Sequence, residues 1–173
     1  MTDMNDLMVD DVDYWLDCLP RYQLSSVQIM LESGKSFEEV AAAWMSGSVA
    51  GTTAPFSSGL GPKIFFEHFM DQMHDLLCTG NRYEEERAGI MAGFKPKQTG
   101  LAATISAAIA PHLGAAPAII APATALILCA VSKMGLGAWC AMQTQRRSNS
   151  PDGTPTQQPG PLPEPPPGTD EQS

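Results

Sequence analysis

Apolar positions recur at helical spacing through residues 9–94, and the pattern predicts a series of short amphipathic helices. Apolar side chains three or four residues apart form one stripe on each segment, which is typical of a helix packed on a core. The stripe is broadest over residues 62–78, where the polar side chains lie on the opposite face. The predicted helices span residues 9–19, the residues after Ser25, the residues after Ser36, residues 62–78 and residues 82–91.

Proline and glycine divide these helices from one another. Pro20, Gly34 and Gly47 each follow an apolar stripe, where they favour the end of a helix. Ser36 and Glu39 have the spacing of a capping box, which predicts the start of the third helix. The Gly-, Ser- and Thr-rich residues 47–62 predict a long loop between the third and fourth helices.

A long apolar stretch from residue 99 to residue 143 dominates the second half of the chain. Residues 98–132 contain no Asp, Glu, Lys or Arg, and His112 is their one side chain with an ordinary pKa near neutral pH. Pro117 and the residues around Gly114 interrupt the stretch, which predicts an αα-hairpin whose second helix spans residues 118–143. The many Ala and Gly residues would let the two helices approach closely.

The chain therefore predicts an all-α fold: a small bundle of short amphipathic helices, an Ala/Gly-rich apolar αα-hairpin and a disordered Pro-rich C-terminal tail. The tail has few apolar side chains, too few to offset the entropy lost on ordering. The expected segments are a frayed N-terminus (1–8), a helical domain (9–94), a basic hinge (95–98), the apolar hairpin (99–143) and the tail (144–173).

Composition and charge narrow the classes of function and the compartment. Hydrophobic residues make up 43 % of the chain, which excludes a polytopic membrane protein. The formal net charge is −9, and no basic patch is present on which a phosphate backbone could lie, so nucleic acid is not the expected partner. The acidic N-terminus has no apolar segment of the kind found in signal peptides, so the cytoplasm, or the cytoplasmic face of a membrane, is expected.

The four cysteines have neither the spacing of a zinc site nor the density of a disulfide scaffold. No two of them form a C-x-x-C pair. Two belong to the apolar stretch, where a free cysteine behaves as a small apolar side chain. All four are therefore expected to be free thiols in a reducing compartment.

The polar face of the helix at residues 62–78 is the strongest candidate for chemistry. Glu67, Asp71, His74 and Asp75 share one side, and Cys78 follows His74 by one turn. A metal-binding bundle needs a second motif of this kind, and a nucleophilic cysteine needs an oxyanion hole; the sequence contains neither. The face is therefore expected to be solvated, with no catalytic residue, metal, cofactor or small-molecule substrate.

Residues 25–56 resemble the first part of a helix-turn-helix. A short helix, a glycine turn and a capped Ala-rich helix occur in the right order. The position of a recognition helix is taken by residues 46–55, which contain two glycines, one proline and no basic side chain. A DNA-binding regulator is thus a weak alternative, because a recognition helix needs continuity and donors for bases and phosphates.

These patterns favour a non-enzymatic interaction or accessory protein. Its hairpin would pack on a protein partner, on a second copy or on the chain's own core. The expected contacts are the large apolar side chains of the hairpin, namely Leu101, Ile105, Ile109, Ile120, Ile127, Val131 and Trp139.

The alternative is a membrane-associated effector that inserts the 99–143 hairpin into a bilayer. A spanning helix needs about 20 apolar residues, and each arm of the hairpin is short of that or interrupted by Lys133. Basic side chains at both ends of the hairpin would anchor it on one leaflet; these are Lys95, Lys97, Arg146 and Arg147.

Overall fold

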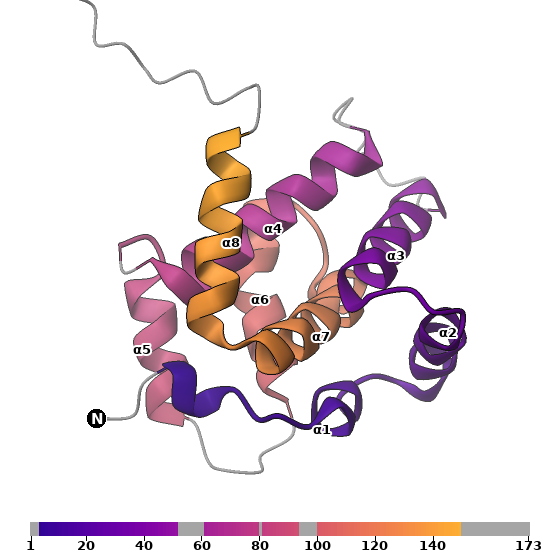
Figure 1. Ribbon diagram of the computed structural model, residues 1–173, viewed down its shortest axis with the longest axis horizontal. Helices are drawn as coiled ribbons and strands as arrows, with labels where there is room; N and C mark the ends of the chain where they lie inside the picture. The colour runs from indigo at the N-terminus through magenta and orange to yellow at the C-terminus, as the bar shows by residue number, and fades with distance from the viewer. Residues whose placement is uncertain (1–3, 52–60, 80, 94–99, 150–173) are drawn as a thin grey trace, which may run out of the picture.

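The computed structural model describes residues 4–51, 61–79, 81–93 and 100–149, and confirms an all-α fold with no strand among these residues (Figure 1). A short 3-10 helix, η1 (Met4–Leu7), comes first. The α-helices are α1 (Val12–Leu16), α2 (Arg21–Glu32), α3 (Phe37–Gly51), α4 (Pro62–Cys78), α5 (Glu84–Gly93), α6 (Leu101–Leu113), α7 (Pro117–Met134) and α8 (Leu136–Asn149).

Helix α7 is the centre of the fold. It packs against α1, α2, α3, α6 and α8, and Figure 1 shows it between α3 and α8. All residues from Pro122 to Cys129 are buried. A helix that is apolar all round is stable in water only when neighbours cover every face, and the middle of α7, residues 122–129, meets that condition.

The predicted αα-hairpin forms from α6 and α7. Gly114 ends α6 with a φ of 63°, a left-handed conformation that glycine adopts without strain. Pro117 is the first residue of α7, where its missing N–H has no partner in a helix anyway. The hairpin therefore follows from local signals in the sequence.

The second helix of the hairpin was predicted to continue to residue 143, and this is wrong. Gly135 has a φ of +90°, and it separates α7 from α8. Residues 144–149, predicted to belong to the tail, continue α8 to Asn149. The rest of the predicted disordered tail, residues 150–173, lies outside the described residues, as do the basic hinge and most of the loop predicted at 47–62.

Helix boundaries in the first half also differ from the prediction. Met4 and Leu7 of η1 are buried, so the segment 1–8 is anchored from residue 4 onward rather than frayed. Helix α1 is shorter than predicted and begins where the Asp11 carboxylate accepts the N–H groups of Asp13 and Tyr14. Helix α3 passes through Gly47, because this glycine does not adopt the positive φ that ends a helix.

The capping box of α3 is confirmed. The Ser36 N–H donates to a Glu39 carboxylate oxygen at 2.7 Å, and the Glu39 N–H donates to the Ser36 hydroxyl at 3.2 Å. Two free donors at the helix start are satisfied reciprocally.

Tryptophan side chains join the first half of the chain to the hairpin. Trp15 Nε1 donates to the Val9 carbonyl and to the Ser132 hydroxyl, each at 2.9 Å. Trp44 Nε1 donates to the Ile119 carbonyl at 3.1 Å. The buried apolar residues of both halves belong to one hydrophobic cluster. The hairpin is thus part of the same core as the helices that precede it.

Candidate functional site at the α4–α8 seam

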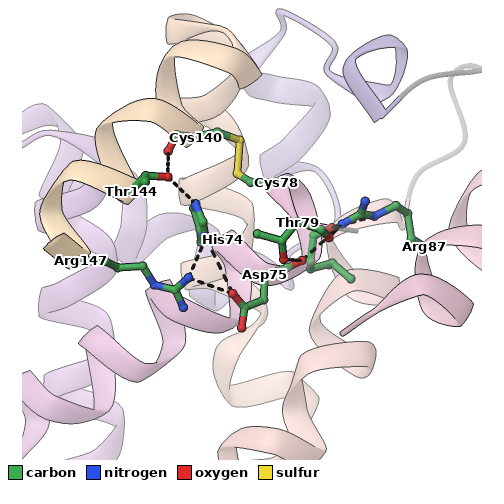
Figure 2. Close-up of a disulfide and its surroundings, with 9 residues drawn as sticks. His74, Asp75, Cys78, Thr79, Arg87, Cys140, Thr144 and Arg147 are labelled. Carbon is green, nitrogen blue, oxygen red and sulfur yellow. Dashed lines mark hydrogen bonds and ion pairs between the residues drawn. A yellow bond between two sulfur atoms is a disulfide. The ribbon is translucent and has the colours of Figure 1, made fainter. Parts of the chain in front are cut away.

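Helices α4 and α8 lie side by side in antiparallel register, and their contacts form the α4–α8 seam. Along α8, Cys140, Thr144 and Arg147 follow one another at steps of four and three residues. Their partners along α4, in the opposite direction, follow the same steps: Cys78, His74 and Asp71. Figure 2 shows the His74 ring between Thr144 and Arg147, next to the disulfide.

A disulfide joins Cys78 to Cys140 at one end of the seam, with their Cα atoms 5.7 Å apart. The prediction that all four cysteines are free thiols is therefore wrong for this pair. The two cysteines are 62 residues apart, and only the pairing of α4 with α8 brings them together. Cys18 and Cys129 are free, as predicted, and burial raises the pKa of the Cys129 thiol to about 12.

Arg147 holds the other end of the seam. Its Nε donates to Asp71 Oδ1 at 2.7 Å and its NH1 group to Asp75 Oδ1 at 2.9 Å. Burial alone would lower the pKa of Arg147, but hydrogen bonds and charge attraction from the two carboxylates raise it overall. Asp75 also faces Arg82, whose NH1 group lies 3.6 Å from its second oxygen. The two aspartates are therefore neutralised by arginines rather than left open for a ligand.

His74 lies between these two ends, and both of its ring nitrogens are engaged. Arg147 NH1 donates to Nδ1 at 2.9 Å, which requires Nδ1 to be unprotonated. Nε2 therefore carries the hydrogen and donates to the Thr144 hydroxyl at 3.1 Å, while that hydroxyl donates to the Cys140 carbonyl. Burial and the positive charge of Arg147 lower the pKa of His74, although Asp75 and Asp71 act in the opposite direction. The seam thus holds a neutral histidine.

The free energy of unfolding is expected to fall as the pH is lowered from about 7 to about 5. The unfolded imidazole has an ordinary pKa of 6.5, whereas the folded one has a lower pKa. In this window the unfolded state binds more protons, so acid favours unfolding; the contribution of His74 is complete above 6.5 and is lost as the pH falls toward the folded pKa. Urea unfolding at several pH values measures this slope. His74→Gln, which keeps an acceptor and a donor, should flatten it, and an equal slope in the variant would contradict the assignment.

Two buried donors of α8 have no hydrogen-bond partner among the described residues. They are Trp139 Nε1 and Gln143 Nε2, one turn apart on the face of α8 that is packed inward. A buried donor left unsatisfied costs about 1–3 kcal/mol. The docking of α8 therefore carries an unfavourable polar term in addition to its favourable apolar contacts.

Arg87 fixes the end of α4 from which Cys78 projects. Its guanidinium donates to the carbonyl oxygens of Asp75, Leu76 and Thr79. Figure 2 shows Thr79 beside Arg87. These carbonyls belong to the last turn of α4 and to Thr79 just after it, so a cation placed on them stabilises the helix end.

The polar face of α4 was predicted to be solvated, and α8 instead covers much of it. His74 is 5 % exposed, while Glu67, one turn from Asp71, remains on the surface. No group of three or more potential metal ligands comes together in the described ranges. The sequence did not predict the partners on α8, Thr144 and Arg147, because their polar segment was assigned to the disordered tail.

The structure places the predicted contact residues of the hairpin in the chain's own core. All seven are buried, with Leu101 the most exposed at 8 %. Of the predicted anchors, Lys95 and Lys97 lie outside the described residues. Arg147 belongs to the seam, and Arg146 donates to a Glu38 carboxylate oxygen of α3 at 2.9 Å. In the segment compared with a helix-turn-helix, the residues up to Gly51 continue α3 instead of starting a recognition helix.

Comparison with protein families, with curated proteins and with solved structures finds no match to this chain.

Proposed function

We propose that the chain is a non-enzymatic interaction protein whose apolar hairpin forms its own core and whose contact surface is the outer face of α2. The observation that carries this proposal is the exposure of two large apolar side chains on one helix. Tyr22 is 70 % exposed and Ile29 is 67 % exposed. They are seven residues apart, which places them on the same face, two turns from each other.

The surface between these two side chains is uncharged. Residues 22–31 contain no charged side chain. The exposed hydroxyls of Ser25 and Ser26 donate to carbonyls of their own helix, those of Arg21 and Tyr22, at 3.0 and 3.1 Å. A neutral strip with apolar anchors two turns apart is the arrangement by which a helix binds an apolar groove on another protein.

The opposite face of α2 is held on the core. Val27 is fully buried, and the Gln23 amide donates to the Ala118 carbonyl at 3.5 Å. Because α2 is already folded and fixed, binding through its outer face would cost little conformational entropy.

The seam supports a function without catalysis. Both nitrogens of His74 are engaged inside the protein, and the nearest cysteine, Cys78, is oxidised. Burial raises the pKa of both free thiols, Cys18 and Cys129, which makes them poor nucleophiles.

A photo-reactive phenylalanine analogue in place of Ser26, between the two anchors, tests the proposal in cells. We expect cross-linked adducts of defined mass with a protein partner or a second copy, and none from the same analogue at the exposed position Glu85 of α5. Tyr22→Ser with Ile29→Ser should abolish the adducts while changing stability by less than about 0.5 kcal/mol, because both side chains are at the surface. Equal cross-linking from both positions, or adducts that persist in the double variant, would contradict the proposal.

The alternative, a membrane-associated effector, is supported by the length of α7. Among the described residues α7 is one helix of 18 residues that is long and apolar enough to cross a membrane, and 56 % of it is buried inside the fold. The core helix of a folded protein in water meets the same criterion. Because α7 here is surrounded by five helices, we favour the first proposal.

A further inference from the structure

We propose that the Cys78–Cys140 disulfide is a reversible thiol–disulfide site that latches α8 onto α4, and that a dithiol reductant opens the latch. The inference rests on the construction of the α4–α8 seam and is independent of the contact surface on α2. It assigns to α8 two states: docked when the cysteines are joined, and released when they are reduced.

The connection between α7 and α8 is a single, uncrowded residue. Gly135, with its φ of +90°, connects α8 to the buried helix α7, and an added Cβ there or at Gly137 would meet no neighbour within 4 Å. Helix α8 comes at the end of the described chain and packs mainly on α4 and α7. Release of α8 would therefore leave the contacts of α7 with α1, α3 and α6 in place.

Without the disulfide, the docking of α8 is compromised by its own buried polar groups. On docking, Trp139 Nε1 and Gln143 Nε2 lose water and gain no hydrogen-bond partner in the part of the chain that the structure describes. On release both donors return to water. The other links across the seam are the hydrogen bonds of His74 with Thr144 and Arg147 and the ion pairs of Arg147, whose side chain is 37 % exposed. Ion pairs at such exposure stabilise weakly. The covalent bond acts together with the apolar burial of Trp139 and Leu136, and without it that burial and the weak ion pairs alone oppose this polar cost.

Both cysteine residues are half-buried rather than fully buried, which gives a reductant access to the bond. A thiolate of the reductant attacks one sulfur, the S–S bond breaks, and a mixed disulfide forms. The second thiol of the reductant resolves it. The reductant leaves as a disulfide, and Cys78 and Cys140 each gain one electron and one proton to become thiols. In a reducing compartment the open state would prevail, and in an oxidising compartment the closed state.

Hydrogen–deuterium exchange of the full chain, with and without dithiothreitol, tests the latch. On reduction, amides of α8 should exchange faster by about tenfold or more. A tenfold change in the opening equilibrium corresponds to the free-energy cost of one unsatisfied donor. Amides of α7 should keep their rates, and an oxidant should restore the protection of α8. Cys78→Ser with Cys140→Ser should show the fast exchange without reductant, and Cys18→Ser with Cys129→Ser should respond as the parent does.

A second variant distinguishes a disulfide that controls the docking of α8 from one that only stabilises the whole fold. Gln143→Leu removes one of the two unsatisfied donors, so the increase in α8 exchange on reduction should be smaller than in the parent. Three results would overturn the proposal: no change in α8 on reduction, a loss of protection in α7 as large as that in α8, or two free thiols at Cys78 and Cys140 after treatment with an oxidant.

Discussion

Replacing Trp15 by alanine is expected to lower the free energy of unfolding by about 3–5 kcal/mol. Trp15 is among the largest fully buried side chains, and its indole N–H bonds both to Val9 and to Ser132 of α7. The substitution removes a large apolar volume from the junction of α1 and α7 and leaves a cavity that the surrounding helices fill incompletely. Urea unfolding followed by circular dichroism measures the effect.

Two controls define what the loss means. Trp15→Phe keeps most of the ring and removes the donor, so it should cost less than the alanine variant. Tyr22→Ala, a comparable truncation at an exposed position, should change stability by less than about 0.5 kcal/mol. A cost below about 1 kcal/mol for Trp15→Ala would show that α1 does not pack on the hairpin as the structure has it.

Removing the disulfide by Cys78→Ser with Cys140→Ser is expected to lower the free energy of unfolding by about 4 kcal/mol at 25 °C. The bond closes a loop whose ends are 62 residues apart, and opening the loop returns conformational entropy to the unfolded chain. Denaturant unfolding of the parent and the variant under non-reducing conditions gives the difference.

Reductant provides the matched control for this prediction. It should lower the stability of the parent toward that of the double variant and leave the variant unchanged. Cys18→Ser removes a free thiol and keeps the disulfide, so it should not show the loss of about 4 kcal/mol and should respond to reductant as the parent does. A parent whose stability is the same with and without reductant would contradict the disulfide.

Local sequence signals predicted much of the fold. The capping box of α3, Pro62 at the start of α4, and Gly114 and Pro117 between α6 and α7 each act within a few residues, and each is where the pattern indicated. The prediction that the third helix ends at Gly47 was wrong, because a glycine can lie within a helix when the residues after it continue the helix. Gly135 was missed because the apolar pattern continues on both sides of it.

The seam depends on tertiary pairing, which periodicity does not reveal. The sequence showed Asp71, His74 and Cys78 on one face of α4, but their partners belong to a segment whose start resembled the hairpin and whose end resembled the tail. One signal was available in the sequence. Cys140, Thr144 and Arg147 have the same spacing as Cys78, His74 and Asp71 read backward along the chain. That match has meaning only when α8 is known to be a helix antiparallel to α4.

The central claim is that the apolar hairpin is the core of a protein folded in water. Hydrogen–deuterium exchange of α7 in aqueous buffer, with and without lipid vesicles, tests this claim most directly. If the apolar hairpin is the core of a protein folded in water, the amides of α7 exchange most slowly of all helices, at the rate of global unfolding, and vesicles change nothing. If the amides of α7 exchange freely in buffer and become protected only when vesicles are added, the hairpin is a membrane element and the account is wrong.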